Sequence, residues 1–146
     1  MTLTEHFTWL EVVRSQTATR LGIDNSLPQA LRHNVLTAAE GMERVRGILG
    51  WPITVDSWYR CFALNLKLNG SASSDHLQGW AVDFICPRFG TPHSICLELL
   101  KHDLPFNQLI HEGTWVHISF APALRRQVLT AHFNGGKVTY TQGVAA

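Results

Sequence analysis

The chain has 146 residues, of which 45% are hydrophobic and 16% are charged, and its formal net charge is +1. This length and composition are typical of one globular domain, so we expect a single domain over residues 1–146. A nearly neutral chain has no electrostatic basis for binding nucleic acid or an anionic lipid surface. No run approaches the roughly 20 apolar residues of a membrane span, so we expect no membrane insertion. We also expect a monomer that does not bind nucleic acid.

Two features indicate the compartment in which the chain folds. Residues 1–6 lack the basic stretch followed by an apolar run that marks a signal peptide. The three cysteines, Cys61, Cys86 and Cys96, are an odd number without C-x-x-C spacing, which excludes a full disulfide framework. We therefore expect synthesis in the cytoplasm with reduced thiols.

Two helices are predicted in the first third of the chain. Residues 5–20 are predicted to form a helix whose inward stripe includes Phe7, Leu10 and Val13. Residues 28–49 give the clearest helical pattern, since their apolar side chains recur at three- and four-residue steps. We expect this long helix to support a sheet rather than to form a site.

A strand and a loop follow the long helix. Residues 53–60 alternate apolar and polar side chains, as a half-buried strand does. Arg60 ends this strand, and its guanidinium is a permanently charged donor suited to a developing oxyanion. Residues 62–74 contain glycine, serine and asparagine and are predicted to be a loop at the rim of a cleft.

The next stretch contains a polar turn with His76 and a predicted strand with Asp83. Side chains alternate between the faces of a strand, so the bulky Trp80, Val82 and Phe84 are predicted to face the core. Asp83 then lies on the other face, where the preceding Ala81 leaves open space. Imidazole and carboxylate are both zinc ligands, so His76 and Asp83 are candidate ligands of one metal ion.

Residues 91–102 are predicted to form a helix, and residues 106–120 to form a hairpin around Gly113-Thr114. A two-residue loop with glycine first suits a type II′ turn. Glu112 then pairs with Trp115 and shares a face with His117, because directly opposite residues point to the same side of a sheet. His111 falls on the other face. The hairpin therefore offers His117 as a third ligand and Glu112 as a candidate base.

The Trp115 side chain lies on the same predicted face as Glu112 and His117, where it is either a wall of the substrate groove or a core aromatic. A second hairpin is predicted from residues 126–133 and 137–141 around Asn134-Gly135-Gly136. Together these elements predict an α+β fold with a small antiparallel sheet backed by helices and a metal site on its open face.

Ser74-x-His76-x-x-Gly79-x-Ala81-x-Asp83 followed by Trp115-x-His117 resembles the zinc D-alanyl-D-alanine carboxypeptidase and murein endopeptidase superfamily, M15-like peptidases with the Hedgehog/DD-peptidase fold. The resemblance covers roughly residues 8 to 120 and includes Ser57-x-Tyr59-Arg60, Asn65 and Phe106-x-Gln108-Leu109-Ile110. It implies that His76, Asp83 and His117 bind one zinc ion per chain. Arg60 would polarise the scissile carbonyl. We also expect Ser74 and Trp115 to contact substrate.

One position departs from many relatives. They carry the catalytic acid three residues before the last histidine, where this chain has Thr114, whereas others carry it five residues before, where this chain has Glu112. The resemblance thus implies a zinc peptidase that hydrolyses an amide bond in peptidoglycan stem peptides, with Glu112 as base.

Such an enzyme would act on the cell wall as an endolysin released by a phage lysis system, or as part of a virion. Two alternatives are a D-alanyl-D-alanine carboxypeptidase and a non-catalytic binding module that contains zinc. The presence of both Arg60 and Glu112 argues against the binding module.

Overall fold

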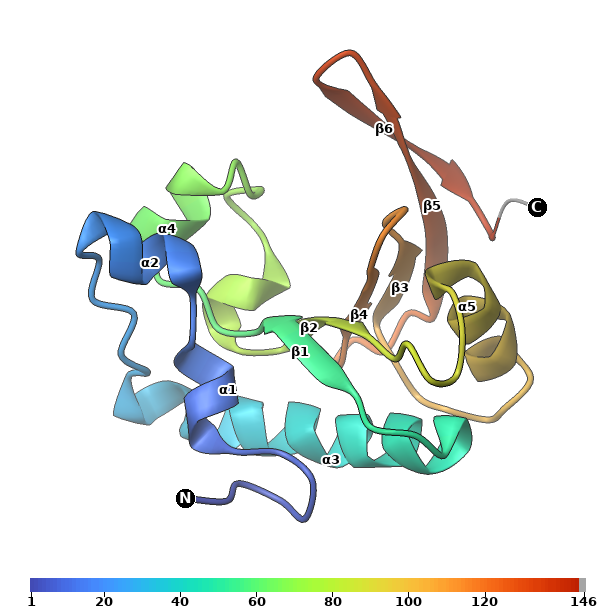
Figure 1. The fold of residues 1–146 in the computed structure, drawn as a ribbon, viewed down its shortest axis with the longest axis horizontal. Helices are drawn as coiled ribbons and strands as arrows, with labels where there is room; N and C mark the ends of the chain where they lie inside the picture. The colour runs from blue at the N-terminus through green and yellow to red at the C-terminus, as the bar shows by residue number, and fades with distance from the viewer. Residues whose placement is uncertain (145–146) are drawn as a thin grey trace.

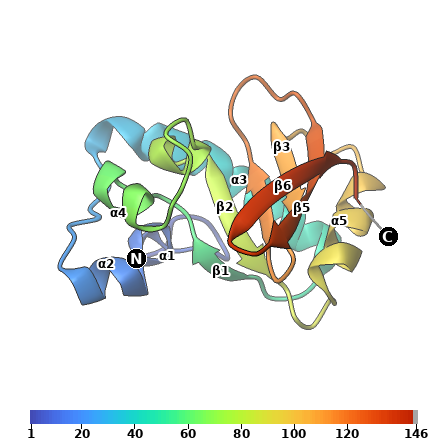
Figure 2. The same cartoon turned by 90° about the horizontal axis from the view of Figure 1, so that it is seen from above.

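The computed structural model describes residues 1–144 and contains one six-stranded sheet with the strand order β1-β2-β4-β3-β5-β6 (Figures 1 and 2). The strands are β1 (Thr54–Ser57), β2 (Ala81–Ile85), β3 (Gln108–His111), β4 (Val116–Ser119), β5 (Gln127–Asn134) and β6 (Lys137–Gln142). The helices are α1 (Trp9–Val13), α2 (Gln16–Leu21), α3 (Arg32–Leu49), α4 (Phe62–Lys67) and α5 (Pro92–Leu100), with 3-10 turns η1 (Gln29–Leu31) and η2 (Asp75–Gln78). The predicted α+β fold is confirmed.

The sheet differs from the prediction in one pairing, because β5 runs parallel to β3 while the other neighbours are antiparallel. The chain leaves β4 and crosses back to the end of the sheet where β3 begins. There the Arg126 N–H donates to the Phe106 carbonyl, and the Gln127 N–H donates to the Asn107 carbonyl. Since β5 starts beside the start of β3, the two strands must run in the same direction.

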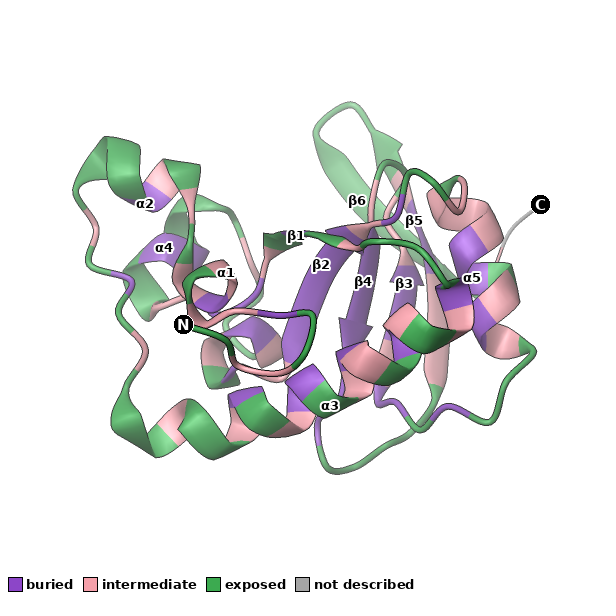
Figure 3. Cartoon of the chain, turned by 60° about the horizontal axis from the view of Figure 1, so that its bottom comes forward, coloured by how far each residue is buried: buried purple, intermediate pink, exposed green. Residues whose placement is uncertain are grey.

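The long helix α3 packs beneath the sheet as predicted (Figure 3). Its buried stripe consists of Val35, Ala38, Ala39, Met42, Val45 and Leu49. Gly50 ends the helix in the left-handed conformation, with φ of 72°. On the face of the sheet that packs against α3, Val82 and Phe84 of β2 and Ile118 of β4 belong to the same apolar core. This core face fixes, by alternation, which side chains of β2 and β4 point to the opposite face.

The helix predicted over residues 5–20 is wrong in detail, because the chain forms two short helices there. Thr8 caps α1 through a capping box with Glu11, and Ser15 caps α2 by accepting a hydrogen bond from the Ala18 N–H. The second cap interrupts the continuous stripe, so Val12 is buried whereas Leu10 is 65% exposed.

The loop predicted over residues 62–74 is also wrong at its start, where α4 forms. Leu64 and Asn65 of this short helix are buried. The glycine and serine residues that suggested a loop come after the helix has ended. The structure describes all three cysteines as free thiols, and none of the helices within residues 1–144 has the length and hydropathy to cross a membrane.

Alanine substitutions at two glycines of α3 are expected to have opposite effects on stability. A Cβ at Gly41 would collide with the ring of Phe120, whereas a Cβ at Gly47 would meet no atom within 4 Å. Gly41→Ala should lower the free energy of unfolding by about 1–3 kcal/mol through overpacking. The matched control Gly47→Ala should raise it by up to about 1 kcal/mol, since alanine favours helix over glycine. Urea denaturation of both variants measures the difference; equal effects would contradict the tight Phe120–α3 contact.

Candidate metal centre and active site

Neighbouring strands bring two of the predicted ligands together. Asp83 of β2 lies directly opposite His117 of β4, and both point away from the core face that Val82 and Ile118 share. His76 reaches the same place from η2. Donor atoms of His76, Asp83 and His117 all lie within 4.8 Å of one another, and all three residues are buried. Within residues 1–144, this is the one such group of three or more histidine, cysteine or acidic residues.

Three contacts hold the His76 turn in place. The Ser74 hydroxyl accepts a hydrogen bond from the His76 N–H at 3.2 Å and so caps η2. The Asp75 carboxylate accepts hydrogen bonds from Ser119 Oγ at 2.6 Å and Asn107 Nδ2 at 3.3 Å, which tie η2 to the sheet. The anchoring role of Asp75 was not predicted, because its partners are 44 and 32 residues away in sequence.

The orientation of the His76 ring identifies which nitrogen is available as a ligand. Nδ1 lies 2.6 Å from the Trp58 carbonyl oxygen. A carbonyl only accepts hydrogen bonds, so Nδ1 must carry the proton. Burial lowers the pKa of His76, although Asp83 acts in the opposite direction. The imidazole is therefore neutral, and Nε2 presents a lone pair.

This lone pair faces other electron-rich atoms. His76 Nε2 lies 3.2 Å from Asp83 Oδ1, and His117 Nδ1 lies 2.9 Å from the same oxygen. His76 Nε2 is buried and has no hydrogen-bond partner among the described residues. A neutral acceptor nitrogen beside a carboxylate oxygen is unfavourable unless a cation lies between them. The two imidazoles and the carboxylate therefore fit a zinc ion, whose usual ligands in proteins include both groups.

The second oxygen of Asp83 is held by Arg60. Arg60 Nη2 donates to Asp83 Oδ2 at 2.9 Å, while Oδ1 faces the two histidines. Burial alone would raise the pKa of Asp83, but the neighbouring His76 and His117 hold it well below its ordinary value. The carboxylate is therefore ionised, and Arg60 fixes its orientation, as partners of metal ligands commonly do.

Arg60 is itself fixed by two further residues. Its Nε donates to Ser57 Oγ at 3.0 Å, and its Nη1 lies 3.5 Å from Asn65 Oδ1. Asn65 is buried in α4, and its amide nitrogen donates to the Ser71 carbonyl at 2.9 Å. The short helix α4, which was predicted to be a loop, thus positions the arginine beside the candidate metal ligands.

The β3–β4 hairpin has the predicted register. Ile110 pairs with His117, His111 pairs with Val116, and the Glu112 N–H donates to the Trp115 carbonyl at 3.0 Å. Gly113 has the positive φ, 82°, that the first position of the predicted turn requires. Glu112 therefore shares the face of His117 and Asp83, at the end of β3.

The carboxyl group of Glu112 is partly withdrawn from water. Burial raises its pKa, with Asp83 acting in the same direction and His117 and Arg60 opposing it. Its carboxylate forms no hydrogen bond with another residue of the described chain. A carboxylate with a raised pKa and no fixed partner is suited to accept and release a proton.

A cleft of about 750 Å³ reaches Asp83 and Arg60, whereas Glu112, His76 and His117 are not among its lining residues. Arg60, Asp83 and Trp115 line it at the metal end, and β1 and the α1–α2 junction form its far walls. Trp115 is half-buried rather than fully buried. Ser74 does not belong to the lining residues and has a local capping role; its predicted contact with substrate, like that of Trp115, stays a prediction.

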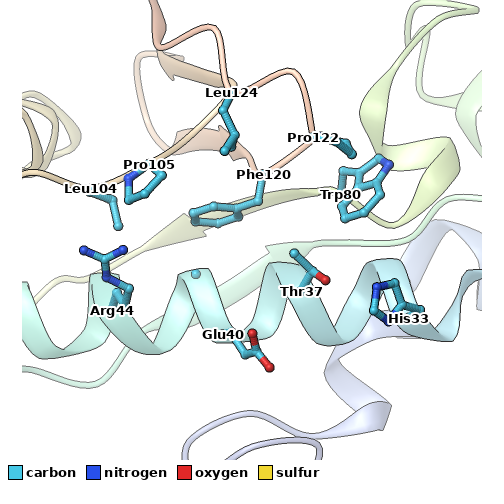
Figure 4. A pocket seen from close by; sticks show the side chains of 11 residues that line it. His33, Thr37, Glu40, Arg44, Trp80, Leu104, Pro105, Phe120, Pro122 and Leu124 are labelled. Atoms are coloured by element: carbon cyan, nitrogen blue, oxygen red, sulfur yellow. The ribbon is translucent and has the colours of Figure 1, made fainter.

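A second cavity of about 420 Å³ lies between α3 and the loops near β4, where Trp80 and Phe120 lie opposite Thr37 and Arg44 of α3 (Figure 4). It contains none of the candidate ligands. Trp80, predicted to be in the core, is instead half-buried at this cavity.

The remaining histidines lie outside the candidate centre. His111 points to the other face of the sheet, where its ring meets His93 of α5 at a centroid distance of 5.7 Å. His6, His102 and His132 contact Glu43, Glu98 and Thr141 respectively. His33 lines the second cavity.

Comparison with curated proteins finds no match to this chain. The family model described as Peptidase M15 matches residues 5–119, a region that contains η2, β2, the β3–β4 hairpin and Arg60. Zinc dependence is general in that family, which agrees with the buried group of His76, Asp83 and His117 that could bind a metal. A match over most of the chain shows the family, and the chain therefore belongs to the M15 peptidases.

Proposed function

We propose that this M15 peptidase is a zinc-dependent murein endopeptidase that hydrolyses an amide bond in peptidoglycan stem peptides. The observation that carries the proposal is the buried group of His76, Asp83 and His117, in which His76 Nε2 has no hydrogen-bond partner within the described chain. Glu112 and Arg60 adjoin this group, and an open cleft leads to it. These features together are those of a catalytic rather than a structural metal site.

In the proposed mechanism, three protein ligands hold zinc, which when bound supplies a Lewis acid that activates water and polarises a carbonyl. Glu112 accepts a proton from the water as the oxygen of that water bonds to the amide carbon. It then delivers the proton to the amide nitrogen as the carbon–nitrogen bond breaks. Arg60 fixes the orientation of Asp83 and contributes positive charge where the carbonyl oxygen becomes negative.

The substrate class follows from the family, and the cleft beside Asp83 and Arg60 is the proposed substrate site. We place the scissile bond next to a D-amino acid. The proposed setting is a phage lysis system or a virion. Either would bring an enzyme that is made in the cytoplasm to the cell wall.

The test uses purified zinc-loaded protein with two defined substrates, a cross-linked stem-peptide dimer and a free pentapeptide stem. Mass spectrometry identifies the products. The proposal predicts internal cleavage of the dimer and slower release of terminal D-alanine from the pentapeptide. Release of D-alanine alone would identify a carboxypeptidase, and binding of both peptides without cleavage would identify a non-catalytic module.

A further inference from the structure

The β5–β6 hairpin extends the face of the sheet on which the candidate active site lies. The parallel register pairs Ile110 with Leu129, so Leu129 shares the face of Ile110 and its antiparallel partner His117. Counting in twos along β5 places Phe133 on that face as well. Phe133 pairs with Val138, and Ala131 pairs with Tyr140. The hairpin therefore presents Phe133, Val138 and Tyr140 on the side of the metal centre.

Direct contacts agree with this register. The Phe133 ring lies 6.3 Å from the Trp115 ring, and a Cβ at Gly113 would come within 3.3 Å of Phe133. Burial raises the pKa of Tyr140, and the charges of Glu112 and Asp83 raise it further. The Tyr140 hydroxyl is thus within electrostatic reach of the candidate base. We call Trp115, Phe133, Val138 and Tyr140 the aromatic shelf.

The aromatic shelf is unusually exposed for its composition. Phe133 is 53% exposed, Val138 is 44% exposed and Tyr140 is 50% exposed. The hairpin projects beyond the helices, at the upper right in Figure 1. An exposed apolar patch of this kind marks a binding surface. Residues 127–142 also lie outside the region that the family model matches, so the hairpin is not inferred from the family.

The strand order places the candidate active site between two surfaces. The cleft lies over β1, and the candidate ligands Asp83 and His117 lie on β2 and β4 with His76 nearby. Glu112 comes directly after the end of β3, and the hairpin β5–β6 follows. A peptide that crosses the strands from β1 to β6 would therefore meet the cleft, then the candidate ligands and base, and then the aromatic shelf. A carboxypeptidase would need room for only one residue beyond the scissile bond.

We propose that the aromatic shelf binds the peptide segment of the peptidoglycan stem on one side of the scissile amide, while the cleft over β1 binds the segment on the other side. This inference rests on the proposed function. The occupant is the substrate itself because the shelf continues the catalytic face through the Trp115–Phe133 contact. Flat aromatic rings suit the aliphatic side chains and methyl groups of such a peptide, which they can cover without a fixed polar partner.

The test combines binding and kinetics. The double variant Phe133→Ala/Tyr140→Ala removes both rings. Thr139→Ala is the matched control, since Thr139 lies on the opposite face of the same hairpin, paired with His132. Each is made in the wild-type chain for kinetics on the cross-linked dimer. Each is also made with Glu112→Gln, so that sedimentation with purified peptidoglycan measures binding without cleavage.

We expect the double variant to raise KM for the dimer, and to weaken sedimentation with peptidoglycan, by roughly tenfold each, as loss of aromatic contacts in a binding site does. The kcat of the double variant should change by less than about threefold. The rise in its KM should be smaller for a single stem peptide than for the dimer. Thr139→Ala should behave like its parents, because Thr139 lies on the opposite face of the hairpin. Thermal melting of every variant separates loss of binding from loss of folding.

The outcomes separate this inference from the proposed function. If the parent protein cleaves the dimer but the folded double variant has unchanged KM and unchanged binding, the aromatic shelf is not a substrate site, although the proposed function stands. If the parent neither binds nor cleaves peptidoglycan, both are overturned. An equal loss in Thr139→Ala would show that the effect comes from the hairpin as a whole and would also overturn the assignment to this face.

Discussion

Replacing His117 with alanine should remove zinc from the protein and abolish its hydrolysis of peptidoglycan. His117 supplies one of three donor atoms within 4.8 Å of one another. Without His117, only two protein ligands would remain to bind zinc. Loss of a hydrogen-bond partner of a ligand typically costs about 10–100-fold in metal affinity, so loss of a ligand should cost more. Zinc content after equilibrium dialysis, read by atomic emission, measures the effect.

The matched control is His111→Ala. His111 is six residues from His117 in sequence but points to the other face, against His93. It should keep both zinc and activity. Full zinc occupancy in His117→Ala would remove β4 from the site, and loss of zinc from folded His111→Ala would reverse the assignment of the two faces.

His76→Ala and Asp83→Ala should also lose zinc, but they differ in their effect on stability. Removing the Asp83 carboxylate leaves Arg60, whose side chain is 14% exposed, without its ionic partner. A largely buried arginine without its ionic partner destabilises the fold. Thermal melting of the zinc-free proteins should therefore show a larger decrease for Asp83→Ala than for His117→Ala.

Replacing Glu112 with glutamine should separate catalysis from metal binding. Glutamine keeps the size of the side chain but cannot accept a proton. Glu112 lies on the face of His117 through the hairpin register and is not one of the three clustered donors. The variant should bind zinc with near-normal affinity, while hydrolysis should fall by about 10²–10⁴-fold, the usual contribution of a general acid–base group.

The measurement is the loss of turbidity of purified cell walls, with zinc determined in the same samples. Clearance at the parental rate by zinc-loaded Glu112→Gln would show that Glu112 is not the base, while the ligand set would remain unaffected. Loss of zinc from the variant would instead mean that Glu112 supports the metal site itself.

Local sequence patterns predicted the parts of the site that depend on strand geometry. Alternation along β2 placed Val82 in the core and Asp83 on the opposite face. The two-residue loop at Gly113 fixed the pairing of Ile110 with His117, because a loop of that length leaves only one antiparallel register. Such patterns act over a few residues, so they can be read without knowledge of the tertiary structure.

Contacts between distant segments could not be predicted in this way. The anchor from Ser119 to Asp75 spans 44 residues, and the bond from Arg60 to Asp83 spans 23. The parallel placement of β5 depends on where the chain crosses after β4, and two nearby residues, Leu124 and Arg126, have positive φ without being glycine. The split between α1 and α2 was predictable in principle, since Ser15 is a favoured cap.

The most direct test of the metal centre is crystallography of zinc-loaded protein with anomalous scattering recorded on both sides of the zinc absorption edge. We predict one zinc peak per chain, within bonding distance of His76 Nε2, Asp83 Oδ1 and His117 Nδ1, and with Glu112 outside its ligands. A zinc peak at another site, such as the His93–His111 pair, or the absence of an ordered peak from the group of His76, Asp83 and His117 would contradict the assignment.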